Sequence, residues 1–274
     1  MKRFITIGCG VASLLAMSLA SSCNSKDDPE ILKPVSEHIL GKWNISDGYI
    51  FNDGKWEKHD DPASPRITYD FKASNSLLMC STDGEGWSSY STLPYEVDES
   101  KMTVTTGSAE SKIELLSADS LVMVSDFIHN PTTGELLPEP LHYKWGFSRS
   151  DSAGQSLGEM LVGKWEFLGT EEKKDGVWTD STDVMTPDES TMEFTADGLY
   201  ILDMVIFGEE YETKYSWKIN NASGSVQMKL VDGDHIIDGR VEFVGNDKMW
   251  IYYTGTSDGG AVRELRDECS RIVQ

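Results

Sequence analysis

Histidine and acidic residues that lie close together in the sequence are the groups best suited to metal or acid–base chemistry. Two short segments combine them: His59-Asp60-Asp61 and Asp232-Gly233-Asp234-His235. Both are typical of turns, where Asp and Gly are favoured for backbone reasons, and the five histidines lack the spacings of a zinc site. No nucleophile elbow, phosphate-binding loop or zinc-binding helix motif occurs either. We therefore predict no catalytic residue, no metal and no cofactor, and a protein that is not an enzyme.

One cysteine follows a segment that predicts covalent processing. Met1-Lys2-Arg3 is basic, residues 4–20 carry no charge, and small residues lead directly into Cys23. This order of a basic, an apolar and a small-residue region is that of a secretory signal. Acidic, polar sequence follows at once, without the basic flank of a membrane-spanning helix. The sequence therefore predicts a cleaved signal peptide over residues 1–22.

The residues around this cysteine resemble those of a known class of anchored protein. Leu19-Ala20-Ser21-Ser22-Cys23 resembles the lipobox of bacterial lipoproteins, in which the thiol is acylated. Lys26-Asp27-Asp28 resembles the export tag of Bacteroidetes surface lipoproteins. The resemblance implies a lipidated tether over 23–36 and a membrane partner reached through the lipid on Cys23. It also implies an exported protein at the outer membrane, exposed on the cell surface.

The overall composition is that of a folded, strongly acidic protein. Of 274 residues, 39% are hydrophobic and 10% aromatic, which is enough to fill a core in each half of the chain. The formal net charge is −22. A chain this negative repels the phosphate backbone, so we predict that it binds no nucleic acid.

An internal repeat divides the chain into two similar halves. Ile39-Leu40-Gly41-Lys42-Trp43 recurs 122 residues later as Leu161-Val162-Gly163-Lys164-Trp165. The same offset carries Asp53-Gly54-Lys55-Trp56 onto Asp175-Gly176-Val177-Trp178. Several matches at one offset indicate two homologous units. The predicted division is a first domain at 37–149, a polar, Gly- and Ser-containing linker at 150–158, and a second domain at 159–270.

Each unit has the residue pattern of an all-β domain. Segments such as Ile67–Phe71 and Tyr215–Ile219 alternate apolar and polar residues, which is the pattern of a half-buried antiparallel strand. Asp-Gly turn signals separate about eight such segments in each unit. Only 36–40 and 157–161 resemble a helical turn. Eight short strands fit either an up-and-down barrel or a two-sheet sandwich, and spacing alone leaves both open.

The repeated Gly-Lys-Trp favours the barrel. Gly41-Lys42-Trp43 and Gly163-Lys164-Trp165 resemble the motif that opens the first strand of lipocalins. The context, including Phe194-Thr195-Ala196-Asp197-Gly198, resembles the lipocalin-like domains of Bacteroidetes lipoproteins. The resemblance implies two tandem eight-stranded antiparallel barrels, each with an end closed by the tryptophan and an arginine packed over it. The residues expected to close the barrels are Gly41, Trp43, Arg149, Gly163, Trp165 and Arg266.

An eight-stranded barrel either holds one small ligand or is filled by its own side chains. Bulky residues are expected to point inward at Tyr69, Phe71, Met102, Met192, Phe194, Tyr215, Trp217, Met228 and Phe243. One hypothesis is a small hydrophobic ligand of unknown identity, bound by residues that the sequence does not identify. The alternative is a surface module with filled barrels that contacts a protein or glycan partner. Turn tryptophans suited to such contacts are Trp56, Trp87 and Trp178.

Two cysteines remain outside the signal peptide and the anchor. Cys80 lies in the first unit and Cys269 in the second. In an oxidising compartment the two could form a disulfide, whereas single cysteines are more often small buried apolar residues. The sequence leaves both alternatives open.

Overall fold

The structure is a computed structural model. The residues that it describes are 34–59, 66–107, 109–129, 135–150, 155–181, 189–256 and 260–273. The predicted signal peptide, Cys23 and most of the tether lie outside these ranges. In the described part of the chain, no helix combines the length and the apolar character needed to span a bilayer.

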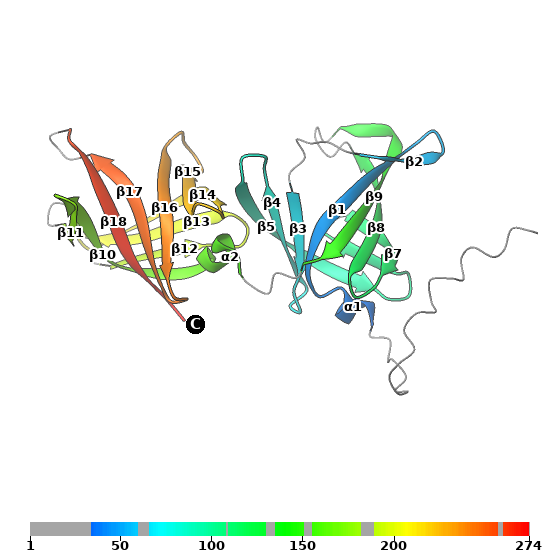
Figure 1. Ribbon diagram of the computed structural model, residues 1–274, viewed down its shortest axis with the longest axis horizontal. Coiled ribbons are helices and arrows are strands. Elements are labelled where there is room, and N and C mark those ends of the chain that lie inside the picture. The colour runs from blue at the N-terminus through cyan, green and yellow to red at the C-terminus, as the bar shows by residue number, and fades with distance from the viewer. Residues whose placement is uncertain are drawn as a thin grey trace, which may run out of the picture. The chain divides into compact units, whose positions relative to one another are not determined.

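The first half of the described chain is a closed antiparallel barrel (Figure 1). A short helix, α1 (Val35–His38), precedes it. The eight strands of the barrel are β1 (Gly41–Asn52), β3 (Arg66–Phe71), β4 (Ser76–Thr82), β5 (Trp87–Asp98), β6 (Thr103–Thr106), β7 (Ala109–Leu116), β8 (Ser120–His129) and β9 (Leu136–Arg149). Each strand pairs with the next, and β9 pairs back onto β1. We call this the first barrel.

The second half repeats this arrangement. The helix α2 (Leu157–Leu161) comes first. The eight strands are β10 (Gly163–Lys174), β12 (Glu189–Phe194), β13 (Leu199–Ile206), β14 (Glu209–Asn220), β15 (Ser225–Leu230), β16 (Ile236–Val244), β17 (Lys248–Thr256) and β18 (Val262–Arg271). The last strand, β18, pairs back onto β10. This is the second barrel.

The pairing confirms the predicted all-β fold of closed eight-stranded antiparallel barrels. A two-sheet sandwich is excluded because the first strand of each barrel pairs on both sides, β1 with β3 and β9, and β10 with β12 and β18. Two short strands, β2 (Lys55–Lys58) and β11 (Val177–Asp180), were not predicted. Each extends the end of the first strand as a hairpin through an Asp-Gly turn with positive φ at both residues.

A tryptophan and an arginine close one end of the first barrel. Trp43 is fully buried, and its Nε1 donates a hydrogen bond to the carbonyl of Ile39 at 2.7 Å. The guanidinium carbon of Arg149 lies 4.0 Å from the centre of the Trp43 ring. Arg149 also donates to the carbonyls of Leu40 at 2.8 Å and His38 at 2.7 Å. The arginine thus covers the tryptophan and satisfies the carbonyls at the end of α1, which have no intrahelical partner.

The second barrel is closed in the same way, but by a different arginine from the one predicted. Trp165 is fully buried and donates to the carbonyl of Leu161 at 2.9 Å. The guanidinium carbon of Arg271 lies 4.1 Å from the centre of the Trp165 ring. Arg271 donates to the carbonyls of Val162 at 3.0 Å and of Met160.

The prediction that Arg266 covers Trp165 is therefore wrong. Successive residues of a strand face opposite sides, so Arg266 points outward from β18 whereas Arg271 has inward parity. The guanidinium carbon of Arg266 instead lies 4.0 Å from the centre of the Trp250 ring, on the outer face of the barrel. Arg266 also forms an ion pair with Glu171. The repeat offset of 122 residues carries Arg149 onto Arg271.

The glycine of each Gly-Lys-Trp motif is required by this closure. Gly41 has φ +103° and Gly163 has φ +137°, a region that favours glycine. A Cβ at Gly41 would lie 3.1 Å from Arg149 Nη1, and one at Gly163 would lie 2.5 Å from Arg271 Nη1. A side chain at either position would therefore displace the arginine.

Both barrels have cores of inward side chains. The first core comprises Ile39, Trp43, Phe71, Leu77, Tyr95, Val104, Ile113, Leu121, Met123 and Phe147. The second includes Leu161, Trp165, Met192, Phe194, Tyr200, Tyr215, Trp217, Ile219, Val226, Met228, Val241, Met249, Ile251 and Cys269. Met102, expected to point inward, is 38% exposed because it lies in a turn with positive φ. Cys80 and Cys269 are both free thiols.

A half-buried carboxyl group lies on the inward face of β18 in the second barrel. Asp267 lies two residues from each of the buried residues Leu265 and Cys269 on β18, so its side chain points to the same, inward face. Its Oδ1 accepts hydrogen bonds from Thr170 Oγ1 at 2.7 Å and Tyr253 Oη at 3.1 Å. Burial raises the pKa of Asp267 to about 6, against the lowering effect of the two hydrogen bonds. The ionised form is therefore disfavoured in the folded state.

We expect Arg271→Ala to lower the free energy of unfolding by about 3 kcal/mol, because the variant loses charged hydrogen bonds to carbonyls and the contact with Trp165. Arg266→Ala is the control: it removes an outward arginine in a surface ion pair, and we expect a loss of about 1 kcal/mol. Urea denaturation followed by circular dichroism measures both. Equal losses in the two variants would contradict the assigned closure.

We expect Asp267→Asn to stabilise the protein at pH 7.5 and to have little effect at pH 4. The pKa of Asp267 is higher in the folded state, so wild-type stability falls as pH rises from the ordinary value of 3.8 to about 6. This difference corresponds to about 3 kcal/mol above pH 6. Asparagine keeps an oxygen that accepts both hydrogen bonds. Thermal unfolding of both proteins across pH 4 to 8 tests this, and a constant difference in Tm would contradict it.

Candidate functional site

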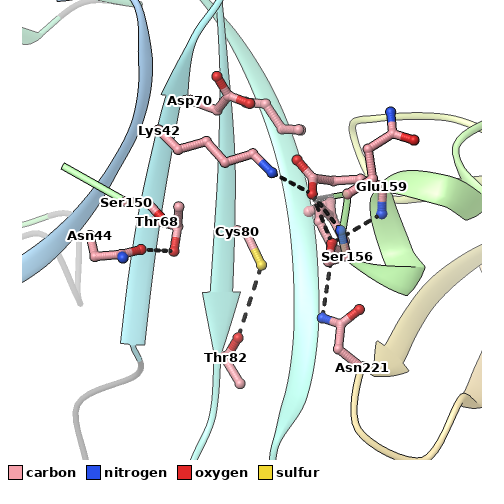
Figure 2. Close-up of a pocket in the computed structure, with 13 residues that line it drawn as sticks. Lys42, Asn44, Thr68, Asp70, Cys80, Thr82, Ser150, Ser156, Glu159 and Asn221 are labelled. Carbon is pink, nitrogen blue, oxygen red and sulfur yellow. Dashed lines mark hydrogen bonds and ion pairs between the residues drawn. The ribbon is translucent and has the colours of Figure 1, made fainter. Parts of the chain in front are cut away.

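A hollow lined by polar side chains and an apolar strip lies on the outside of the first barrel, where α2 and the β14–β15 turn cover its outer surface. Its volume is about 460 Å³. Figure 2 shows the thirteen residues that line it. They come from β1, β3, β4, β5 and the end of β9 on one side, and from α2, the residues before it and the β14–β15 turn on the other. We call this hollow the cleft, and we treat it as the candidate functional site.

The floor of the cleft is made by outward residues of neighbouring strands. Lys42 and Asn44 on β1 lie opposite Asp70 and Thr68 on β3, and Thr68 lies opposite Cys80 on β4. Because alternate residues of a strand share a face, this register brings all five side chains to the same surface. Thr68 Oγ1 donates to Asn44 Oδ1 at 2.9 Å (Figure 2).

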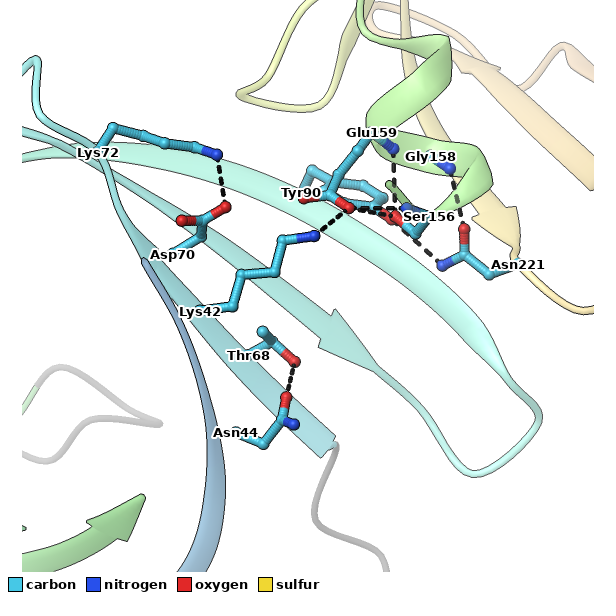
Figure 3. A network of polar contacts seen from close by, with 10 residues as sticks. All are labelled: Lys42, Asn44, Thr68, Asp70, Lys72, Tyr90, Ser156, Gly158, Glu159 and Asn221. Atoms are coloured by element: carbon cyan, nitrogen blue, oxygen red, sulfur yellow. Dashed lines mark hydrogen bonds and ion pairs between the residues drawn. The ribbon is translucent and has the colours of Figure 1, made fainter. Parts of the chain in front are cut away.

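The opposite wall is held by a capping box at the start of α2. Ser156 N and Ser156 Oγ lie 2.8 and 3.1 Å from Glu159 Oε2, while Glu159 N donates to Ser156 Oγ at 3.3 Å. Lys42 reaches across from the first barrel, with Nζ 2.8 Å from the same carboxylate oxygen (Figure 3). Burial acts to raise the pKa of Glu159, but the hydrogen bonds from Lys42 and Ser156 outweigh it and hold the pKa below its usual range.

A tyrosine of the first barrel completes the contact between the two barrels. Tyr90 points outward from β5, is 4% exposed, and belongs to the core of the second barrel, where its ring stacks on Trp217 with centres 5.2 Å apart. Its hydroxyl lies 3.1 Å from Ser156 Oγ and accepts from Asn221 Nδ2 at 3.2 Å (Figure 3). Gly158 N donates to Asn221 Oδ1 at 2.9 Å. Burial raises the pKa of Tyr90 far above its ordinary value.

Backbone pairing reinforces this contact. Ser88 and Trp87 at the start of β5 pair with Ile219 and Asn220 at the end of β14. This two-residue ladder joins the barrels directly. The cleft is therefore bounded by a fixed joint.

The arrangement is suited to hydrogen bonding and offers no activated nucleophile. Its charged groups are paired: Lys42 with Glu159, and Asp70 with Lys72 at 2.5 Å. No histidine lines the cleft. Among the described residues, no group of three or more His, Cys, Asp or Glu side chains could hold a metal ion. Such a site can bind a molecule by shape and hydrogen bonds.

The predicted residues that the structure describes lie away from this cleft. Gly41, Trp43, Gly163 and Trp165 are at the closed ends of the barrels, and Cys23 is outside the described residues. Each of the three turn tryptophans is partly buried beneath a cation on the outer surface. Lys144 Nζ lies 4.6 Å from the centre of Trp56, Lys218 Nζ 4.8 Å from that of Trp87, and the guanidinium carbon of Arg266 4.6 Å from that of Trp178. They pack along the barrel surface.

The two histidine–aspartate segments are placed in turns as far as they are described. His59 follows β2, and its backbone N–H bonds Gly48. Asp60 and Asp61 are outside the described residues. The carbonyl of His235 accepts from Leu230 in the turn between β15 and β16. Sequence reasoning missed the cleft, although Ser156-Leu157-Gly158-Glu159 carries the Ser-x-x-Glu signal of a capping box.

Comparisons with known proteins give weak similarities. No family model and no curated protein matches the chain. Among solved structures, it is similar to a protein with unknown function from the DUF3598 family of Nostoc punctiforme, with 9% identity, 86% of this chain and 97% of that chain covered, and a TM-score of 0.28. It is also similar to a mutant of transferrin binding protein B from Haemophilus parasuis, with 8% identity, coverage of 85% and 76%, and a TM-score of 0.25. At these TM-scores neither similarity indicates a function.

We expect Gly158→Ala to loosen the joint between the barrels, because a Cβ at this position would overlap the Tyr90 ring. Differential scanning calorimetry should then resolve two unfolding transitions where the wild type shows one. Gly169→Ala is the matched control, since a Cβ at Gly169 meets no heavy atom within 4 Å. A single transition at the wild-type temperature in Gly158→Ala would contradict a tight joint.

Proposed function

We propose that this chain is a non-enzymatic binding lipoprotein whose recognition surface lies outside its two barrels. Export and anchoring rest on the sequence: the signal over residues 1–22, the acylated Cys23 and the acidic tag at Lys26-Asp27-Asp28. The lipid holds the protein on the outer membrane, and the tag favours the cell surface.

The observation that carries this proposal is the close packing of side chains at the closed end of both barrels. In the first barrel Trp43, Phe71, Leu77 and Leu121 are at most 1% exposed. In the second, Trp165, Phe194, Ile219 and Met249 are fully buried. Side chains packed in this way leave little room for an internal ligand at the closed ends. The outer surface, by contrast, carries the cleft of about 460 Å³.

A small hydrophobic ligand inside the first barrel is the second candidate. Tyr143 and Trp145 have inward parity on β9, are only partly buried, and stack with ring centres 5.5 Å apart. Partly exposed aromatic rings are a favourable surface for an apolar molecule. Binding there would require these rings to move, because Trp145 already packs against Gly48.

Native mass spectrometry of the full chain released from membranes by detergent tests both parts of the proposal. We expect a covalent mass increase from acylation, which Cys23→Ser abolishes, and no lipid held noncovalently. A stoichiometric lipid that remains with the Cys23→Ser protein would favour the internal ligand. An unmodified Cys23 in membrane-extracted protein would contradict the anchor.

A further inference from the structure

The charges that line the cleft are already satisfied within the protein. Lys42 and Glu159 form an ion pair in which the side chains are 20% and 13% exposed. Asp70 is 7% exposed and is paired with Lys72. An anionic ligand would meet two carboxylates, and a cationic ligand would have to displace a lysine and leave it unpaired, which is costly at a partly buried position. The cleft therefore favours an uncharged molecule.

Hydrogen-bonding capacity in the cleft remains open at two amide side chains. Asn44 accepts from Thr68 through Oδ1, and within the described residues its amide nitrogen has no hydrogen-bond partner. Gln155 also lines the cleft, and neither end of its amide is bonded to a described residue. Each amide nitrogen can donate, and the Gln155 oxygen can also accept. Hydroxyl groups match this combination because each one both donates and accepts.

The cleft also has an apolar strip beside these polar groups. Leu78 and Cys80 on β4 and Tyr90 on β5 line its surface. A sugar ring presents hydroxyl groups at its edge and C–H groups on its face, so it suits a site that has both kinds of surface. The Tyr90 ring is already stacked on Trp217, and the strip therefore offers contact without a free aromatic face.

The walls are fixed before any ligand arrives. The capping box of Ser156 and Glu159, the ion pair to Lys42 and the buried Tyr90 hold the two sides of the cleft together. A preformed site loses little conformational entropy on binding. The volume of about 460 Å³ lies within the usual range for small-molecule sites.

We infer that the cleft binds a neutral, hydroxyl-rich ligand of one or two sugar rings. Asn44 and Gln155 contact its hydroxyl groups, and Leu78 and Cys80 contact its apolar face. The inference rests on the proposed function, because it requires recognition outside the barrels.

The test is saturation-transfer NMR on the full chain in a detergent without a sugar headgroup. The probes are glucose, galactose, maltose, lactose and cellobiose, with glucuronate and glucosamine as charged analogues. We expect at least one neutral sugar to bind. The affinity of the charged analogues should be at least about fivefold lower than that of the neutral sugar. The double variant Asn44→Ala and Gln155→Ala should lose about tenfold in affinity, since it removes two hydrogen-bonding groups.

The internal repeat supplies the matched control. Glu166 occupies the position of Asn44 on the outer face of β10, and Glu166→Ala should leave binding unchanged. No binding by any neutral sugar would overturn the inference, and so would full binding by the double variant or equal binding of the charged analogues. None of these results changes the native mass spectrum, so the filled-barrel proposal stands or fails separately.

Discussion

The structure depends on how a tryptophan is buried at the end of each barrel. An indole ring fills that end, but its N–H must find an acceptor where water is excluded. In both barrels the acceptor is a carbonyl of the preceding helical segment, Ile39 for Trp43 and Leu161 for Trp165. An arginine on the last strand covers the ring and takes two further carbonyls from the same segment. One interaction thus ties the entry segment, the first strand and the last strand together.

This closure also determines where the cleft can form. Because Arg271 binds the carbonyls of Met160 and Val162, the end of α2 is fixed against the second barrel. The start of the same helix carries Ser156 and Glu159, which face the first barrel. A five-residue helix therefore links the closed end of one barrel to the outer surface of the other.

The sequence was sufficient for the features that repeat. Period-two alternation and the offset of 122 residues predicted the strands and the two copies, because both signals come from local backbone geometry and from shared ancestry. The choice of Arg266 failed because it followed a loose motif near the chain end. Applying the repeat offset to Arg149 leads to Arg271 directly. The hairpins formed by β2 and β11 could also have been predicted, since their Asp-Gly turns are visible in the sequence.

The cleft could not be predicted in the same way, because it arises where the two copies differ. The strand register places Asp203 and Glu212 of the second barrel at the positions of Cys80 and Tyr90 in the first. An outward tyrosine can be buried by a neighbouring domain, whereas two carboxylates resist burial. The outer surface of the first barrel is therefore the one that becomes covered.

This asymmetry places the cleft on the outer face of the first barrel. Inward residues are constrained by packing, since adding or removing one methylene group in a dense core lowers the stability of the fold. Outward residues such as Asn44, whose counterpart is Glu166, are free of that constraint and can diverge. The two barrels share their strand order, and the outer face of the first differs from that of the second where the other barrel covers it. At the joint, described side chains from both copies line a space of molecular size.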